Sequence, residues 1–327
     1  MNVHIASYNT FPTAAGLASS AAGYAALVTA LSELFGAKET YPGEMSTIAR
    51  QGSGSACRSL YGGFVAWRMG GKQDDGSDSI AQQVAPESHW PEIRALIMVV
   101  SDAKKGTSST AGMSTSVATS SLLDYRAKEL VSKRMSIIEK AWMERDFQTF
   151  GRLTMIDSNQ FHAVCLDTFP PIFYMNDVSK NIIQIVHVYN EWAGEIRAAY
   201  TFDAGPNAVL YTLEIYTVEL GALMLKYFPA YCEKYICNNQ FKCKVDAFTL
   251  EPSLVEAAER TSIKPCVGDV KKIYFTKSGP GPKTLGPEHA VIDSKTGLNK
   301  YKAWDLSILH VCILLLKWFT VEYYIEL

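Results

Sequence analysis

The stretch PTAAGLASSAAG, residues 12–23, decides how the first part of this chain folds. Pro12 and Gly16 shape a loop, and its small residues let the backbone approach a ligand closely. Ser19 and Ser20 then begin a helix whose apolar residues repeat at helical spacing. Free N–H groups and the dipole at a helix N-terminus favour an anion, so the loop is a candidate phosphate-binding site. It has neither the Lys-Ser/Thr pair of a P-loop nor GxGxxG, and an Ala/Ser-rich turn that only caps the helix is the alternative.

Two further loops carry residues suited to chemistry. GSGSACRS (52–59) places Arg58 after small residues, and a guanidinium can hold a carboxylate or phosphate through two hydrogen bonds. A surface arginine is the alternative. TFDAGPN (201–207) places Asp203 where a strand ends, and a carboxylate there can accept a proton or orient a hydroxyl. The alternative is an aspartate that only opens a turn.

The remaining polar segments give weaker indications. KKGTSSTAGM (104–113) reads as a loop that closes over phosphates or is simply solvated, with Ser109 and Thr110 among its hydroxyls. In DSNQFHAVCLD (157–167), His162 beside an aromatic residue is interpreted as structural. The sequence shows no Ser/His/Asp order typical of a nucleophilic triad.

Periodicity and turn residues predict a mixed, α+β order of elements. Strands are expected at 2–8, 64–67, 95–100 and 272–277, with a hairpin formed by 198–203 and 208–213. Helices are expected from Ser19 onward and near 44–51, 122–144, 146–157, 176–189 and 216–227.

Composition narrows the classes of function. With 48% apolar and 20% charged residues, the 327-residue chain is expected to be globular. A net charge of −2, with Lys and Arg spread along the sequence, argues against nucleic-acid binding. Cys232, Cys237 and Cys243 cluster without the spacing of a zinc site, so no metal site is expected in the protein itself.

The chain ends give no sign of a signal peptide or a stable membrane span. The N-terminus lacks a basic region followed by an apolar core. The apolar stretch over 306–321 is short and interrupted by His310 and Lys317, although membrane attachment through it is a competing interpretation.

Together the motifs resemble the GHMP kinase superfamily and, within it, the mevalonate diphosphate decarboxylase family. PTAAGLASSAAG is similar to the superfamily's phosphate motif, and four longer stretches follow in the family's order: GSGSACRSLYGGF, DSNQFHA, FPPIFYMND and YTFDAGPNAVLY. The resemblance implies a two-lobed GHMP fold, with a truncated N-terminal lobe like ribosomal protein S5 and a ferredoxin-like C-terminal lobe. The implied domains are residues 1–92 and 93–300, followed by a tail over 301–327 that resembles nothing in the family.

The resemblance also implies an activity: ATP-dependent decarboxylation of mevalonate 5-diphosphate to isopentenyl diphosphate, with Mg²⁺, by a cytoplasmic homodimer of isoprenoid and sterol biosynthesis. Asp203 would act on the substrate's tertiary hydroxyl as base or orienting group, and Arg58 would hold its carboxylate. The ATP phosphates would lie against Gly16, Leu17, Ala18, Ser19 and Ser20. The substrate would contact Ser53, Gly54, Ser55, Ala56, Cys57, Arg58, Ser109 and Thr110.

The chain departs from the family at both ends. Family members carry an upstream strand with a Lys-Tyr-Trp-Gly-Lys type motif, so we expect a gene model with a misplaced start and an unspliced 3′ segment. Reduced stability and weak or absent turnover are expected as a result. Two alternatives stay open: a GHMP small-molecule kinase that stops after phosphorylation, and a non-catalytic nucleotide-binding fragment.

Overall fold

The structure of the protein is a computed structural model. It describes residues 3, 5–13, 15–71, 73, 75–103, 106–229, 239–286, 289–293, 320, 321, 323 and 324. The expected cysteine cluster at Cys232 and Cys237 and most of the apolar 306–321 stretch lie outside these residues.

The chain forms two compact units, each built from separate stretches of sequence. The first comprises 1–13, 18–87 and 278–325, and the second comprises 14–17, 88–277 and 326–327. The candidate phosphate loop is thus divided between the units after Leu17. The expected domain boundaries at 92 and 300 remain predictions.

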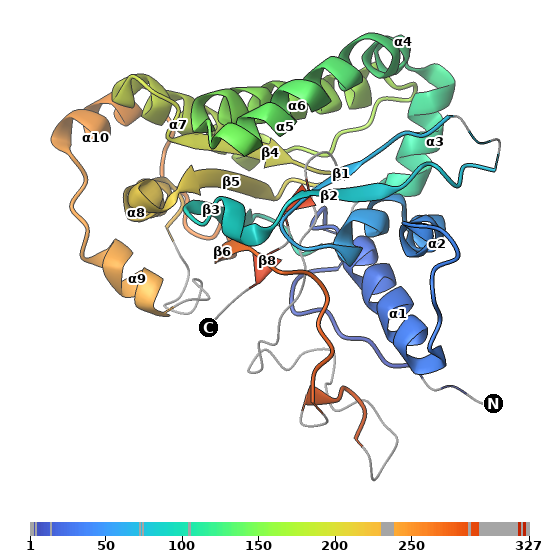
Figure 1. The fold of residues 1–327 in the computed structure, drawn as a ribbon. Coiled ribbons are helices and arrows are strands. Elements are labelled where there is room, and N and C mark those ends of the chain that lie inside the picture. Colours follow the sequence, from blue (N-terminus) through green and yellow to red (C-terminus); the bar gives the residue numbers. More distant parts are fainter. Residues whose placement is uncertain are drawn as a thin grey trace. The chain divides into compact units, whose positions relative to one another are not determined.

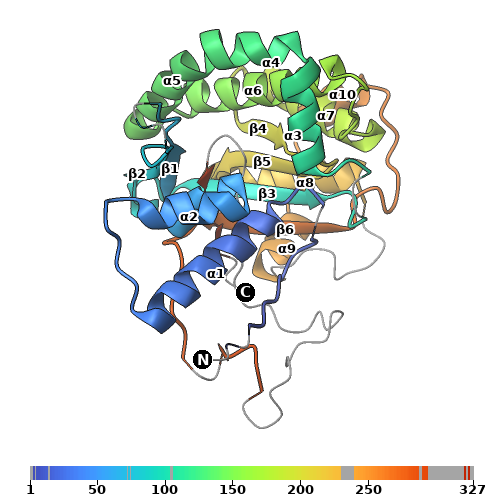
Figure 2. The ribbon, with the colours of Figure 1, turned by 90° about the vertical axis from the view of Figure 1, so that its right-hand side faces the viewer.

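The first unit packs two helices and a 3₁₀ segment against a small sheet. The helices α1 (Ser19–Phe35) and α2 (Glu44–Gly52) lie side by side (Figure 2). Alanines allow the close approach of α1, α2 and the 3₁₀ segment η1 (Gly54–Leu60), because Ala21, Ala49 and Ala56 are fully buried together. The strand β1 (Phe64–Trp67) pairs antiparallel with β2 (Ala81–Ala85) and with β7 (Thr320–Val321).

The second unit is organised by an antiparallel sheet in the order β4-β5-β3-β6 (Figure 1). Its central strand β3 (Ile93–Val99) is almost wholly apolar and buried, as expected for a strand covered on both faces. The strands β4 (Ala198–Phe202) and β5 (Ala208–Leu213) form the predicted hairpin, with Ala198 opposite Thr212 and Phe202 opposite Ala208. The strand β6 (Lys272–Ser278) completes this sheet. The short strand β8 (Tyr323–Tyr324) falls within the 278–325 stretch of the first unit.

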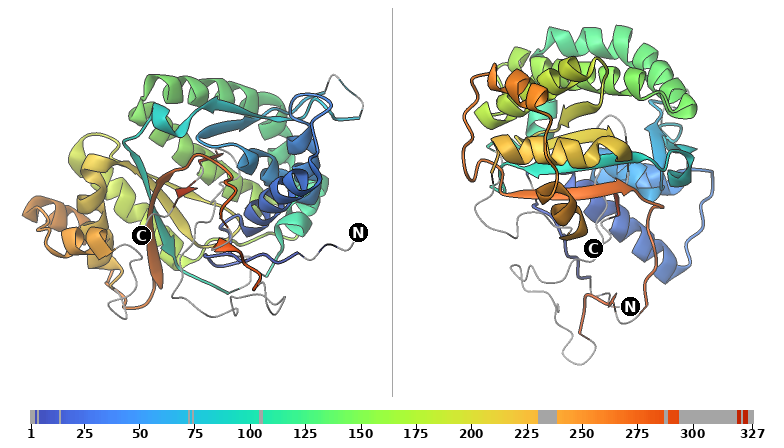
Figure 3. Two further views of the ribbon diagram at one scale, coloured as in Figure 1. Left: turned by 60° about the horizontal axis from the view of Figure 1, so that its bottom comes forward. Right: turned by 90° about the vertical axis from the view of Figure 1, so that its left-hand side faces the viewer.

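Helices cover this sheet. In Figures 1 and 2, α5, α6 and α7 lie above β4, and in Figure 3 α8 lies against β3. The buried ring of Phe150 on α6 lies 4.8 Å from Trp142 and 5.3 Å from Tyr211, centroid to centroid, and so ties α5 and α6 to β5. The helical segments of this unit are α3 (Ser109–Thr119), α4 (Ser121–Tyr125), η3 (Arg126–Leu130), α5 (Val131–Glu144), α6 (Phe147–Asp167), α7 (Asp177–Ala193), η4 (Glu214–Tyr216), α8 (Thr217–Tyr227), α9 (Asn239–Asp246) and α10 (Pro252–Glu259), with η2 (Glu87–His89) at the sequence boundary between the units.

Most expected elements form, and two expectations are wrong. Residues 5–8 are not a strand, since no strand of the described chain pairs with them and Ile5 is 62% exposed. The expected loop at 104–113 becomes helix α3 from Ser109 onward, because the Ser108 hydroxyl caps the helix by accepting a hydrogen bond from Ala111 N.

None of the helices within the described ranges is long and apolar enough to cross a membrane.

Candidate active site

The loop that leads into α1 has a left-handed backbone at two positions. Gly16 has φ +78°, and Ala18 immediately before the helix has φ +57°, a left-handed conformation that alanine seldom adopts. Ala18 offers no capping side chain, and the first turn of α1 carries no acidic residue. The helix N-terminus is therefore electrostatically suited to a phosphate group.

The predicted carboxylate lies in a well-defined turn after β4. Asp203 is 7% exposed, and its carbonyl accepts a hydrogen bond from Gly205 N at 2.7 Å. Just before it, Phe202 N donates to the Ser158 hydroxyl on α6. Ala204 is fully buried in a small apolar cluster completed by Cys165, Ile172, Tyr174 and Phe161. These contacts fix the backbone on both sides of the carboxylate.

His162 on α6 lies close to this turn and was not expected to matter for it. Its ring is 6.2 Å from that of Phe202, and its imidazole lies within electrostatic range of Asp203. Burial lowers the pKa of His162 to about 4, so the side chain is neutral at physiological pH. The buried Nε2 atom has no hydrogen-bond partner among the described residues.

Ser109 and Thr110 stand in the first turn of α3, Ser109 half-buried and Thr110 exposed. The Tyr174 hydroxyl donates to the Ser108 carbonyl at 3.4 Å, which connects this helix start to the apolar cluster around Ala204. Burial raises the pKa of Tyr174 to about 12, so it remains a hydrogen-bond donor. A Cβ atom at Gly112 would lie 2.6 Å from that hydroxyl, so only glycine fits there without movement.

In the first unit, the predicted arginine is buried rather than on the surface. Arg58 is 3% exposed, and its guanidinium lies 5.7 Å from the centre of the Trp67 ring. The Ser20 and Ser53 hydroxyls are 3.1 Å apart, so the two small-residue loops of this unit meet.

The other predicted residues of the 52–59 loop divide into two groups. Ser53, Gly54 and Ser55 are half-buried. Ala56 and Cys57 are fully buried, so their side chains face the protein core. Burial raises the pKa of Cys57 to about 11, which keeps it a thiol.

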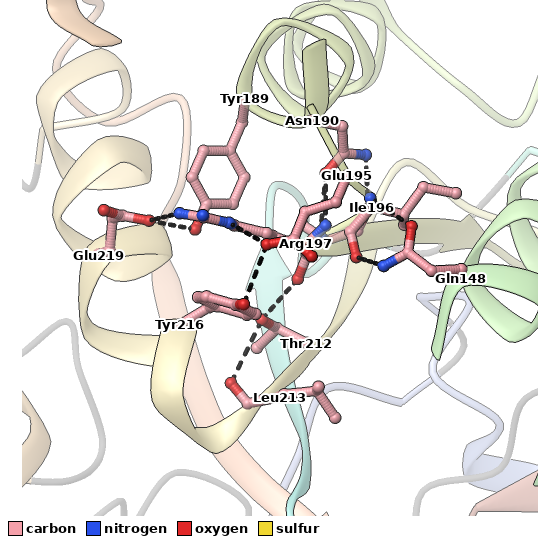
Figure 4. Close-up of polar contacts among 11 residues, drawn as sticks. Gln148, Tyr189, Asn190, Glu195, Ile196, Arg197, Thr212, Leu213, Tyr216 and Glu219 are labelled. Carbon is pink, nitrogen blue, oxygen red and sulfur yellow. Dashed lines mark hydrogen bonds and ion pairs between the residues drawn. The ribbon is translucent and has the colours of Figure 1, made fainter. Parts of the chain in front are cut away.

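A second polar cluster, in the second unit, lies at the end of the hairpin away from the Asp203 turn (Figure 4). There the Arg197 guanidinium is 3.3 Å from the Glu219 carboxylate and 4.5 Å from the centre of the Tyr216 ring. The Tyr189 hydroxyl donates to the same carboxylate, and burial together with that carboxylate raises the pKa of the tyrosine. Because each of these groups has a partner, we interpret the cluster as stabilising the start of β4.

Sequence reasoning did not single out His162, Tyr174 or Asn207 as residues of the site, although all three lie inside quoted motifs. Burial of a polar side chain beside Asp203 is the shared signal, and it becomes visible only in three dimensions.

Among the described residues, no group of three or more His, Cys, Asp or Glu side chains could hold a metal ion.

Family models match both parts of the chain. Residues 1–81 match the diphosphomevalonate decarboxylase-like N-terminal domain, and residues 95–285 match the mevalonate 5-diphosphate decarboxylase C-terminal domain. A diphosphomevalonate decarboxylase of Rattus norvegicus is 52% identical over 300 residues, which covers 90% of this chain and 71% of the relative.

Solved structures agree with these matches and with the predicted α+β fold class. The mevalonate diphosphate decarboxylase from Trypanosoma brucei has a TM-score of 0.78 at 38% identity, covering 86% of this chain and 73% of that one. A structure of MDDEF in complex with MVAPP, AMPPCP and magnesium has a TM-score of 0.60 at 32% identity, covering 68% and 65%. The predicted GHMP-type fold is thereby confirmed, and this chain belongs to the diphosphomevalonate decarboxylase family.

Proposed function

We propose that this chain uses ATP to convert mevalonate 5-diphosphate to isopentenyl diphosphate, phosphate and carbon dioxide. The observation that carries the proposal is the Asp203 turn, which holds a nearly buried carboxylate in a fixed backbone next to the Gly16 loop. The comparisons support the proposal, because relatives that are about 50% identical to this chain are diphosphomevalonate decarboxylases.

Asp203 is proposed to act on the tertiary hydroxyl of the substrate. The carboxylate accepts the hydroxyl proton as the oxygen attacks the γ-phosphorus of ATP, with ADP as the leaving group. Phosphate then departs from the tertiary carbon while the adjacent carbon–carbon bond breaks and carbon dioxide leaves, which forms the double bond. Once Asp203 has released that proton to solvent, its carboxylate is negative again and stabilises the positive charge that develops at the tertiary carbon.

Arg58 is proposed to hold the substrate carboxylate that becomes carbon dioxide. Its guanidinium lies over the Trp67 ring, and an arginine so buried meets an anion with little competition from water. Arg58 must not bind the carboxylate of the ground state more strongly than it binds the transition state. Only an interaction that is stronger in the transition state accelerates the reaction.

Gly16, Leu17, Ala18, Ser19 and Ser20 are proposed to hold the ATP phosphates. Left-handed backbone at Gly16 and Ala18 and the uncapped start of α1 support this role. Magnesium bound to the nucleotide would neutralise its phosphate charge, as in other phosphoryl transfers. The relative in complex with AMPPCP and magnesium supports both ligands.

Ser53, Gly54, Ser55, Ala56, Cys57, Ser109 and Thr110 are proposed to contact mevalonate 5-diphosphate. Half-buried hydroxyls and the start of α3 suit phosphate oxygens. Ala56 and Cys57 would contribute backbone groups only, because their side chains are buried in the core. A homodimer and a cytoplasmic location are proposed from the family resemblance alone.

The test is the stoichiometry of products from the purified chain, incubated with mevalonate 5-diphosphate, ATP and magnesium. The proposal predicts equal amounts of ADP, phosphate and carbon dioxide. ADP without carbon dioxide would indicate a small-molecule kinase, an alternative that the relatives do not favour. Nucleotide binding with no ADP formation would indicate a non-catalytic fragment.

A further inference from the structure

Asn207, at the end of the turn that begins with Asp203, uses its whole side-chain amide to join three segments. Its Oδ1 accepts from Val100 N at 2.7 Å and Ser101 N at 2.9 Å. Its Nδ2 donates to Ala15 O at 2.7 Å and Ser101 O at 2.9 Å. The residue is 1% exposed, so these bonds have little competition from water.

Beside this amide, the loop and the turn touch backbone to backbone. A Cβ atom on Gly205 would lie 2.6 Å from Ala15 O, and one on Gly16 would lie 2.9 Å from Gly205 N. Both positions therefore need glycine for the contact to exist. The turn is held from its other side as well, because the Ser179 hydroxyl donates to Pro206 O at 2.9 Å.

We infer that Asn207 is a positioning residue that fixes the nucleotide loop at residues 15–17 to the Asp203 turn. The inference rests on the proposed function for the identity of the ligands. Phosphoryl transfer depends on placing the γ-phosphate against the attacking oxygen, and small misplacements are costly. Through Asn207, the loop that receives the phosphates and the carboxylate that receives the proton share one rigid support.

The second unit offers a matched control. Asn190 on α7 makes a similar set of bonds, accepting from Arg197 N and Ala198 N and donating to Ala198 O (Figure 4). It holds the opposite end of β4, the end away from Asp203. Substitution of Asn190 removes a comparable set of asparagine hydrogen bonds, none of which involves the nucleotide loop.

The experiment compares the unsubstituted chain with Asn207→Ala, Gly205→Ala and Asn190→Ala. Gly205→Ala is a second route to the same contact, because its added methyl group displaces Ala15 O while the Asn207 side chain remains. Amide hydrogen exchange of the unliganded protein is followed in peptides that cover residues 11–20. The Kd of a fluorescent ATP analogue with magnesium is measured in parallel, together with the KM for each substrate.

Asn207→Ala and Gly205→Ala are expected to speed exchange in this segment and to raise the nucleotide Kd about tenfold. The KM for ATP should rise with it, while that for mevalonate 5-diphosphate stays within about twofold. Asn190→Ala should change neither the exchange of this segment nor the nucleotide Kd. If Asn207→Ala does not fold, the hydrogen exchange and the nucleotide Kd of Gly205→Ala alone test the inference.

Unchanged exchange, or faster exchange with an unchanged nucleotide Kd, would overturn the inference, because Asn207 would then be only a structural residue. If the unsubstituted chain bound no nucleotide, the proposed function would fail instead. The exchange measurement would still show whether Asn207 fixes the loop to the turn.

Discussion

Acid should destabilise this protein through His162, by an amount that follows from its burial. The folded protein holds the pKa of this side chain at about 4, against 6.5 for an unperturbed histidine. At pH values between these two pKa values, His162 is protonated in the unfolded chain and neutral in the folded chain. The stabilising contribution is therefore fully present above pH 6.5 and is lost as the pH falls toward 4.

The size of the effect can be worked out for two convenient pH values. With pKa values of 6.5 and about 4, the free energy of unfolding falls by about 1.3 kcal/mol between pH 7.5 and pH 5.5 from this group alone. Complete protonation below pH 4 would cost about 3 kcal/mol. The change of about 1.3 kcal/mol is measurable, because the free energy of unfolding of a domain is typically about 5–15 kcal/mol.

The assay is urea unfolding of the unsubstituted protein and of His162→Gln at both pH values. Glutamine keeps a polar side chain of similar size and does not titrate, and every other ionisable group is common to the two proteins. We expect the unsubstituted protein to lose about 1.3 kcal/mol more than the variant on acidification. Equal losses in the two proteins would refute the reasoning, because His162 would then titrate alike in the folded and unfolded chains.

Two further substitutions test other parts of the account. Asp157→Asn removes the carboxylate that meets the buried Arg126 through bonds of 2.8 and 2.7 Å, and should lower the free energy of unfolding by about 3–5 kcal/mol in urea titrations. The exposed Asp124→Asn is its control and should cost under about 1 kcal/mol, so a similar cost for both would contradict this. Gly112→Ala should displace the start of α3 from the Tyr174 hydroxyl and raise the KM for mevalonate 5-diphosphate severalfold, whereas an unchanged KM would argue against Ser109 and Thr110 as substrate contacts.

Local signals were sufficient to predict much of the fold. The Asn176–Asp177 pair predicts the start of α7, where the structure shows Asn176 as the N-cap. The unbroken apolar run near residue 97 predicts the central strand β3. The AGPN turn between alternating segments gives the β4–β5 hairpin. In each case the deciding interactions lie within a few residues of one another.

Predictions failed where the outcome depends on distant partners. A strand needs a neighbouring strand, and residues 5–8 have none in the described part of the chain despite their alternating pattern. The helix start at Ser109 is hidden among serines and glycines that equally suit a loop. Asp203 was selected from its motif, but the roles inferred for His162 and Asn207 require contacts with Phe202 and Ala15 that no local pattern encodes.

The central claim is that the Asp203 carboxylate carries out the chemistry. The most direct measurement is carbon dioxide release from mevalonate 5-diphosphate with ATP and magnesium, by the unsubstituted chain, Asp203→Asn and the exposed control Asp124→Asn. The account predicts release by the unsubstituted chain and the control, and a loss of at least about 100-fold in Asp203→Asn with the Kd of the ATP analogue unchanged. Release from Asp203→Asn at the rate of the unsubstituted chain would contradict it.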